Sequence, residues 1–262
     1  MSDKSPSPQP AFDLSGKIAL ITGGNRGLGF AIADALAGAG AKIVIAARDD
    51  QTAGECIAKL RGQGTDCIFV QTDVAQEESR SRCVEAAVAH FGSLHILVNN
   101  AGISIRKLPE QLSLEDWESV IAVNLTAPFA LARLAYPHIK RAGGGKIINI
   151  GSLYSTFGAP MVAPYAASKG GVVQLTRALA TAWAKDAIQV NALIPGWHDT
   201  DLTARARQDV AGLEERVVGR TPAGRWGTPD DIRGAAVFLA SSASDFVTGA
   251  SVVVDGGFSV QG

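Results

Sequence analysis

The fold is decided by residues 17–29, which read KIALITGGNRGLG. The first five of these residues form a short apolar run between Gly16 and Gly23, which is typical of a buried parallel strand. A glycine-rich turn from Thr22 to Gly29 follows, and residues 30–37 then show the apolar pattern of a helix. A strand, a glycine-rich turn and a helix in this order predict a dinucleotide-binding unit.

The spacing of the glycines in this turn is Thr-Gly, three residues, Gly, one residue, Gly, and not the more common G-x-G-x-x-G. Glycines at Gly23, Gly27 and Gly29 let the backbone turn tightly and approach a pyrophosphate. The negative charge of that group is favoured at the N-terminus of the following helix. A plain glycine-rich loop is the alternative, but the position between a strand and a helix favours nucleotide binding.

A second feature is the pair Tyr165 and Lys169, four residues apart in the run PYAASK at residues 164–169. If this run is helical, the two side chains lie on one face. A nearby ammonium favours the phenolate and lowers the phenol pKa from about 10, so that the tyrosine can exchange a proton with a substrate near neutral pH. Taken alone, such a pair is more often a packed ring beside a solvated cation.

Apolar runs of strand length alternate with helical stretches along the rest of the chain. This alternation predicts an α/β fold with a parallel sheet and helices on both faces. The expected strands occupy residues 17–21, 42–47, 67–71, 95–98, 146–150 and 189–194. Because no repeat or linker interrupts the pattern, we expect one domain over residues 13–262, preceded by a flexible proline-rich tail over residues 1–12.

The composition excludes several classes of function. The 262 residues are 47% hydrophobic, enough for a full core, and the net charge of −1 does not favour nucleic acid or a membrane surface. We find no signal peptide and expect no membrane-spanning segment. Three cysteines without metal spacing suit a reducing cytoplasm, and four dispersed histidines predict no catalytic metal.

Motifs at the ends of the expected strands resemble, in order, those of the short-chain dehydrogenase/reductase family. They are the turn from Thr22 to Gly29, Asp73-Val74, Asn99-Asn100-Ala101-Gly102, Asn124, Ser152, Tyr165 with Lys169, Pro195-Gly196, and Thr200. The resemblance covers the chain from about residue 14 to its end. It implies a Rossmann-type doubly wound sheet of seven parallel strands, the last over residues 251–255. Within the family, the chain most resembles gluconate 5-dehydrogenases and 2-deoxygluconate dehydrogenases.

The resemblance implies a nicotinamide cofactor and a family role for each matching residue. Tyr165 is then the general acid/base, Lys169 lowers its pKa and holds the nicotinamide ribose, Ser152 orients the substrate oxygen, and Asn124 supports a water. The implied cofactor-binding residues are Gly23, Asn25, Arg26, Gly27, Leu28, Gly29, Arg48, Asp73, Val74, Asn100, Ala101, Gly102, Tyr165, Lys169, Pro195, Gly196 and Thr200. Structural alternatives are that Asp73 is only a helix N-cap, Asn124 a helix kink and Ser152 a loop hydroxyl.

The end of the second expected strand indicates which nicotinamide cofactor is preferred. Relatives that prefer NAD commonly carry an acidic residue there, which binds the ribose hydroxyls. Here that position is Ala47, with Arg48 next to it and Arg26 inside the glycine turn. A guanidinium binds a 2′-phosphate through two hydrogen bonds. We therefore expect NADP(H) to be preferred over NAD(H), the alternative being two unrelated surface arginines.

The substrate is less well defined, and a keto-sugar acid or polyol is the leading hypothesis. Arg106 and Lys107 resemble the basic pair of gluconate 5-dehydrogenases, and a guanidinium there suits a carboxylate, although Arg106 could equally be a solvated loop charge. The expected pocket residues are Ser104, Arg106, Tyr154, Met161, Trp197 and His198. Alternatives are a broad carbonyl reductase, a 3-oxoacyl thioester reductase, or a non-catalytic NADP-binding sensor.

Two further expectations concern His198 and the assembly. Relatives usually carry Ile or Val at the position of His198, so its imidazole is either a solvated loop side chain or reshapes the pocket mouth. The resemblance also implies a homotetramer. The helix that carries Tyr165 is small and apolar on more than one face, and a sheet can cover only one of them.

Overall fold

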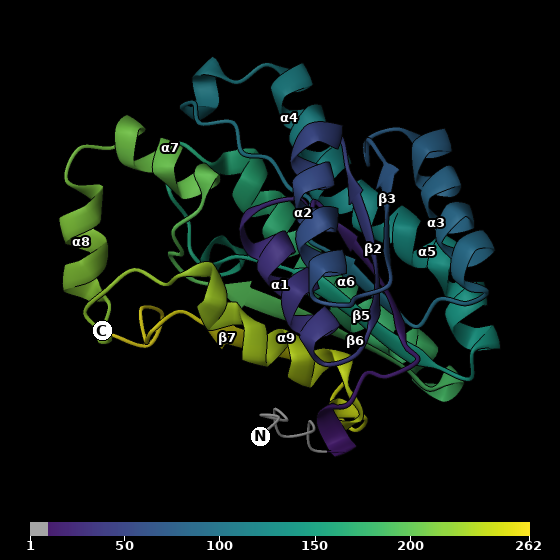
Figure 1. The fold of residues 1–262 in the computed structure, drawn as a ribbon. Coiled ribbons are helices and arrows are strands. Elements are labelled where there is room, and N and C mark those ends of the chain that lie inside the picture. Colours follow the sequence, from purple (N-terminus) through teal and green to yellow (C-terminus); the bar gives the residue numbers. More distant parts are fainter. Residues whose placement is uncertain (1–9) are drawn as a thin grey trace, which may run out of the picture.

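The computed structural model describes residues 10–262, and a single sheet of seven parallel strands forms its centre (Figure 1). The strand order is β3-β2-β1-β4-β5-β6-β7. The strands are β1 (Ile18–Thr22), β2 (Lys42–Ala47), β3 (Cys67–Gln71), β4 (Ile96–Asn99), β5 (Gly145–Ile150), β6 (Ile188–Pro195) and β7 (Ser251–Val254). All seven expected strands are confirmed, and each strand end lies within one residue of the expected position.

The strand order reverses between β1 and β4, and this reversal sets the position of the site. The chain builds β1, β2 and β3 outward in one direction and then returns to place β4 beside β1. In such sheets a crevice opens at the carboxyl ends of the two strands that flank the reversal. The carboxyl ends of β1 and β4 lead directly into Gly23 and Asn100.

Helices cover both faces of the sheet, as the alternating pattern predicted. On one face pack α1 (Gly27–Gly38), α2 (Asp50–Gly62) and α9 (Arg233–Ala240); on the other pack α3 (Glu77–Phe91), α5 (Ala127–Arg141) and α6 (Ala163–Trp183). All five residues of β1 are buried between these two layers. The central strands are therefore apolar on both faces, which is why they read as continuous runs and not as alternating patterns.

The helices α4 (Leu114–Ile121) and α5 are joined by the π-helical turn η3 (Ala122–Thr126) into one helical segment of 28 residues. Its length and a mean hydropathy of 1.3 over an 18-residue window are those of a helix that could cross a membrane, and a buried core helix of a globular protein has the same two properties. The alternating polar and apolar residues did not reveal that the three elements are continuous. Buried residues of α5 pack against the sheet, as in the core helix of a globular protein.

Residues 199–226 form an excursion beyond the end of β6, which carries α7 (Asp201–Asp209) and α8 (Leu213–Arg220). Figure 1 shows these two helices standing away from the sheet. A small apolar cluster of its own holds the excursion together, with Leu213 and Val217 packed against Trp197 and Trp226. The excursion therefore has fewer buried contacts than the two main layers.

The short helices are η1 (Pro10–Phe12), η2 (Pro109–Gln111), η4 (Leu153–Ser155), η5 (Ala184–Asp186), η6 (Pro229–Ile232) and η7 (Ser242–Ser244). The element η1 falls within the tail expected over residues 1–12, so that expectation is wrong for its last three residues. The carbonyl of Ala11 accepts a hydrogen bond of 3.1 Å from Ser242 Oγ. The rest of the expected tail, residues 1–9, lies outside the described residues.

Candidate functional site

The candidate site lies at the carboxyl edge of the sheet, because all the strands are parallel and their motifs follow their carboxyl ends. Thr22 joins the two central strands there. Its hydroxyl accepts hydrogen bonds from the backbone N–H groups of Asn100 (3.0 Å) and Ala101 (3.1 Å). The side chain of Asn100 donates in return to the carbonyls of Thr22 (2.9 Å) and Gly23 (3.1 Å). Thr22 was not among the expected site residues, although it is the first residue of the glycine-rich turn.

The glycine turn has the geometry of a phosphate cradle. Gly23 and Gly27 have φ angles of +61° and +51°, which side chains rarely adopt. A Cβ on Gly29 would lie 2.2 Å from the carbonyl oxygen of Gly23, so only glycine lets α1 begin against the turn. The N-cap of α1 is Arg26, whose side chain makes no capping hydrogen bond, so within residues 10–262 the N-cap side chain leaves the first N–H groups of the helix free. These features fit a dinucleotide pyrophosphate.

Asn124 lies inside the π-helical turn η3, so it both interrupts the regular helix and occupies the expected site. The side chain is 1% exposed. Its Oδ1 accepts from Ile103 N at 2.9 Å, and its Nδ2 donates to Ile103 O at 2.9 Å and to Ser168 Oγ at 3.1 Å. Asn124 thereby ties the segment after β4 to α6. The π-turn fits the frequent use of such turns at functional sites.

The expected catalytic residues Asn124, Ser152, Tyr165 and Lys169 form what we call the candidate tetrad, and the charged Lys169 is buried with 4% exposure. Its Nζ donates a 2.7 Å hydrogen bond to the carbonyl of Ile150 and lies 5.7 Å from the ring centroid of Tyr165. A Cβ built on Gly102 would lie 3.7 Å from this Nζ. Burial lowers the pKa of Lys169 from 10.5 to about 8. The ammonium is therefore close to its titration range at neutral pH.

The phenol of Tyr165 departs from the expectation that Lys169 lowers its pKa. Burial raises the pKa of Tyr165 above 10, and interaction with Ser152 lowers it only partly. The physical reason is that removal of water disfavours a phenolate, and Lys169 is not among the groups that shift this pKa. The phenol is therefore protonated at neutral pH, and it lies beside the Ser152 hydroxyl.

Ser152 closes β5, and a neighbouring serine fixes its position. The Ser152 Oγ accepts from Tyr154 N at 3.2 Å, and Ser155 Oγ accepts from Ser152 N at 3.2 Å. The same Ser155 hydroxyl donates to Lys169 O at 2.9 Å. The segment after β5 that carries Ser152 and the helix that carries Tyr165 and Lys169 are thus joined through Ser155. This link was not expected from the sequence.

At the other end of the crevice, Ala47 is buried and Arg48 is exposed at the end of β2. Arg26 has an exposed side chain whose NH1 lies 3.5 Å from the carboxylate of Asp201. Asp49, which follows Arg48, accepts from Thr52 N and caps α2, and its pKa is lowered mainly by that hydrogen bonding. Two guanidinium groups therefore stand beside a position without an acidic side chain in β2.

Asp73 and Val74 follow β3 at the same edge. The N-cap of α3 is Gln76, so the alternative that Asp73 is only a helix N-cap is wrong. The Asp73 Oδ1 instead accepts from Ala75 N at 3.0 Å, and its N–H is bonded to Ser79 Oγ at 3.0 Å. The residues Pro195, Gly196 and Thr200 also lie at this edge, where Thr200 is the N-cap of α7.

A row of aromatic rings leads away from Tyr165 toward the excursion. The centroids of Tyr165 and Tyr154 are 6.1 Å apart, those of Tyr154 and Trp197 are 6.2 Å apart, and those of Trp197 and Trp226 are 5.4 Å apart. The guanidinium of Arg207 lies 4.0 Å from the centroid of Trp226. We call Tyr154, Trp197 and Trp226 the aromatic wall. Trp226 and Arg207 extend the set of expected pocket residues.

Arg106 lies beside this wall: burial raises the pKa of Tyr154, and the charge of Arg106 lowers it only partly. Its side chain is only 19% exposed, so the alternative of a solvated loop charge is wrong. Its Nε lies 3.6 Å from Asp209 Oδ2, beyond hydrogen-bond distance, and is buried with no hydrogen-bond partner in residues 10–262. The guanidinium thus forms a salt bridge with Asp209, while its Nε–H remains a donor available to a ligand. The neighbouring Lys107 is already paired with Asp116 at 2.6 Å.

The remaining expected pocket residues differ in their surroundings. His198 is 3% exposed, so the alternative of a solvated loop side chain is wrong. Its Nδ1 lies 3.3 Å from Gly196 O, and its Nε2 is buried without a hydrogen-bond partner in the described part of the chain. Ser104 and Met161 are half-buried, and neither side chain forms a hydrogen bond within residues 10–262.

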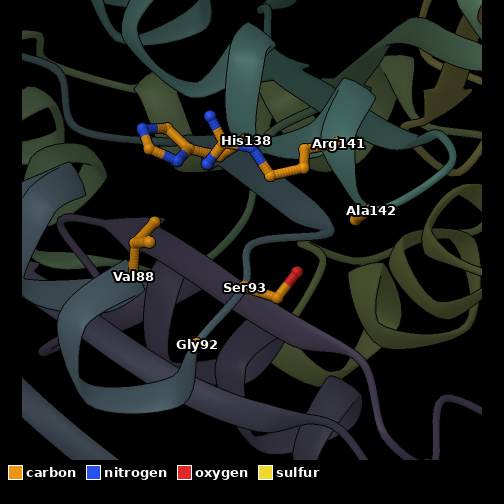
Figure 2. Close-up of a pocket in the computed structure, with 6 residues that line it drawn as sticks. All are labelled: Val88, Gly92, Ser93, His138, Arg141 and Ala142. Carbon is orange, nitrogen blue, oxygen red and sulfur yellow. The ribbon is translucent and has the colours of Figure 1, made fainter.

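A small pocket of about 140 Å³ lies elsewhere, between the C-terminal ends of α3 and α5 (Figure 2). Its lining includes Gly92, Ser93, His138 and Arg141. These residues precede β4 and β5, so the pocket is at the amino edge of the sheet, opposite the candidate site. We assign it no part in the chemistry below.

Comparison with known proteins identifies relatives over almost the whole chain. A family model described as enoyl-(acyl carrier protein) reductase matches residues 23–259. The chain is 41% identical to a 2-dehydro-3-deoxy-D-gluconate 5-dehydrogenase of Formosa agariphila over 94% of each chain. It is 40% identical to a 5-keto-D-gluconate 5-reductase of Escherichia coli strain K12, over 95% of this chain and 98% of the relative.

Among solved structures, a gluconate 5-dehydrogenase of Burkholderia cenocepacia in complex with NADP and tartrate superposes with a TM-score of 0.91. It is 42% identical, and the match covers 96% of this chain and 98% of the other. The sheet order, the motifs at the strand ends and these similarities agree along almost the whole length. The chain belongs to the short-chain dehydrogenase/reductase family and is an oxidoreductase.

Proposed function

We propose that the protein transfers a hydride between NADP(H) and the carbonyl or secondary alcohol of a keto-sugar acid. The observation that carries the substrate class is Arg106, a largely buried guanidinium beside the aromatic wall whose Nε has no hydrogen-bond partner in the described residues. A buried N–H donor is costly unless it is hydrogen-bonded, and a carboxylate is the planar partner that a guanidinium binds best. Relatives named for gluconate or its keto derivatives support the same class.

The residues of the candidate tetrad would share the proton chemistry. Tyr165, whose raised pKa keeps it protonated, donates its phenolic proton to the substrate oxygen during reduction. Ser152 orients that oxygen, since its hydroxyl lies beside the phenol at the end of β5. Lys169 and Asn124 lie behind Tyr165 and join its helix to the segments after β4 and β5. When bound, NADPH supplies the hydride, and the protein supplies position and proton.

The cofactor would lie across the crevice, with its pyrophosphate at the N-terminus of α1 and its nicotinamide near Lys169. The cofactor preference rests on the adenosine end, where Arg26 and Arg48 are exposed and Ala47 offers no carboxylate. NADP in the solved Burkholderia relative supports this assignment. The carboxylate of Asp49 opposes the binding of NADP only weakly, because it already caps α2.

We expect Arg48→Ala to weaken NADPH selectively. A charge-assisted contact is worth about 1.5–3 kcal/mol, so kcat/KM for NADPH should fall by roughly one to two decades while that for NADH changes little. Ala47→Asp should move the preference toward NADH, by adding a ribose acceptor and repelling the phosphate. Steady-state kinetics with both cofactors measure these effects, with Arg141→Ala at the opposite edge of the sheet as the control. Equal use of both cofactors by the wild type would contradict the assignment.

We also propose a homotetramer. Leu114, Trp117 and Phe129 on the α4–α5 segment are exposed at 78%, 39% and 46%, and Val253 in the edge strand β7 is exposed at 47%. Exposed apolar side chains on two separate surfaces suit an assembly that uses two kinds of interface. Light scattering measures the mass of the particle in solution.

A cytoplasmic location completes the proposal. Cys56, Cys67 and Cys83 are all free thiols, and burial raises the pKa of each. Unpaired and unreactive thiols suit a reducing compartment.

The experiment that tests the proposed function is a substrate panel followed by loss of NADPH absorbance. The panel contains 5-keto-D-gluconate and related keto-sugar acids, neutral ketoses, cyclic diketones, steroids and acetoacetyl thioesters. We expect the highest kcat/KM for a keto-sugar acid. A higher value for the thioester or for neutral ketones would favour the acyl thioester reductase or the broad carbonyl reductase, and no turnover at all would favour a non-catalytic sensor.

A further inference from the structure

The excursion over residues 199–226 is closed at its base by pairing between its two ends. Asp199 N donates to Gly227 O at 2.8 Å, and Gly227 N donates to Trp197 O at 2.8 Å. These two bonds form a parallel bridge between His198 and Gly227. The chain therefore leaves the sheet after β6 and is secured again at one point before η6, with α7 and α8 between these two places (Figure 1).

The imidazole of His198 fills the space that Gly227 leaves. A Cβ built on Gly227 would lie 2.8 Å from His198 Cδ2 and 2.9 Å from its Nε2. The φ angle of Gly227 is outside the positive region, so its backbone does not require glycine. Glycine suits this position because it has no side chain, and not because of its backbone freedom. On the other side of the ring, Nδ1 lies 3.3 Å from Gly196 O.

The same bridge positions groups that belong to the site. Trp197 and Trp226 directly precede the two bridged residues, and their rings are 5.4 Å apart. The carbonyl of His198 accepts a 2.6 Å hydrogen bond from Thr203 Oγ1, which also bonds Thr200 N at 3.0 Å at the start of α7. A shift of the bridge would therefore change both the aromatic wall and the N-terminus of α7.

We propose that His198 is a positioning residue. Its imidazole packs against Gly227 at the base of the excursion, a contact that we call the clasp, and so holds Trp197 and Trp226 as a wall of the substrate pocket. The proposal rests on the proposed function in one respect, that a carbonyl substrate lies against this wall. The clasp itself is a property of the fold and does not depend on which substrate is bound.

The clasp should be sensitive to pH. The charged groups that act on the ring are Asp231 and Arg225, which form an ion pair with each other, and Asp255 after β7. Burial lowers the pKa of His198 below 6.5 despite the two carboxylates. The clasped state therefore favours the neutral ring, so the clasp is fully present above pH 6.5 and weakens as pH falls below it.

A pair of complementary variants tests the clasp. Gly227→Ala places a methyl group against the ring, and His198→Ala removes the ring; each should raise KM for the carbonyl substrate by about ten-fold, with kcat changed by less than about three-fold. The double variant removes both the clash and the ring, so its KM should return to within about three-fold of the wild type. Gly219→Ala in α8, where an added Cβ meets nothing within 4 Å, is the control.

Two further readouts separate this inference from the proposed function. Trypsin cleavage at the arginines of the excursion should accelerate in each single variant and slow again in the double variant, and it needs no substrate. His198→Asn, which keeps a donor for Gly196 O and cannot titrate, should abolish the rise of the wild-type KM for a neutral ketone below pH 6.5. Additive effects of the two single variants on KM and on cleavage, or a pH profile unchanged in His198→Asn, would overturn the proposal.

Discussion

Replacement of Tyr165 by Phe should lower kcat by about two to four decades, the range typical for loss of a general acid. The phenol is the group beside Ser152 that is still protonated at neutral pH, because burial raises its pKa. Phe keeps the ring that packs edge-on against Tyr154, so folding and the affinity for NADPH should change little. Single-turnover kinetics and a thermal melt measure the two effects separately.

The control for this variant is Tyr136→Phe. The Tyr136 hydroxyl donates to Asp186 at 2.8 Å on the surface of α5, away from the site. Its loss should leave kcat within about two-fold of the wild type. If Tyr165→Phe turned over like the wild type, the assignment of the proton donor would be wrong.

Replacement of Lys169 by Met should abolish most activity while making the fold more stable. The pKa of Lys169 is lowered from 10.5 to about 8 by burial, which corresponds to roughly 3 kcal/mol of unfavourable charge burial. Loss of the hydrogen bond to Ile150 O offsets about 1 kcal/mol of this. We expect a net gain on the order of 1–2 kcal/mol in the free energy of unfolding at pH 7, and a fall in kcat of about two to four decades.

The pH dependence of this stability gain has a definite sign. Below pH 8 the lysine is charged in both the folded and the unfolded state, so the full cost of burying the charge is present. Between pH 8 and 10.5 the lysine loses its proton in the folded state but not yet in the unfolded state, so the cost of burying the charge disappears. The difference in melting temperature between variant and wild type should thus be largest at pH 7 and shrink toward pH 10. Lys185→Met, at an exposed lysine, should show neither effect.

The sheet could be predicted from the sequence because strands buried on both faces read as uninterrupted apolar runs. The same logic located the candidate site, since the carboxyl ends of parallel strands meet at one edge and each motif follows such an end. Strand ends moved by one residue because apolar runs do not mark where the ladder of hydrogen bonds stops. β4, for example, includes Asn99, whose side chain bonds Asn149 within the sheet.

The environments of side chains could not be predicted in this way. The spacing of Tyr165 and Lys169 showed that they share a helix face, but the direction of the phenol pKa depends on burial by other elements. The burial of His198 depends on Gly227, which follows it only after two further helices. Neither residue type nor local pattern carries that information. Likewise, only the three-dimensional arrangement places Arg106 beside Tyr154 and Asp209.

Under the proposed function, this oxidoreductase reduces a keto-sugar acid whose carboxylate is bound by Arg106. The most direct test of this claim compares kcat/KM with NADPH for 5-keto-D-gluconate and for a neutral ketose, in the wild type, in Arg106→Met and in Lys107→Met. We expect Arg106→Met to lower the value for the acid by about 10- to 150-fold and that for the neutral ketose by less than about three-fold. Lys107→Met, whose ammonium is already paired with Asp116, should change neither. Equal losses of the acid and the neutral ketose in Arg106→Met, or a wild type that prefers the neutral ketose, would contradict the account.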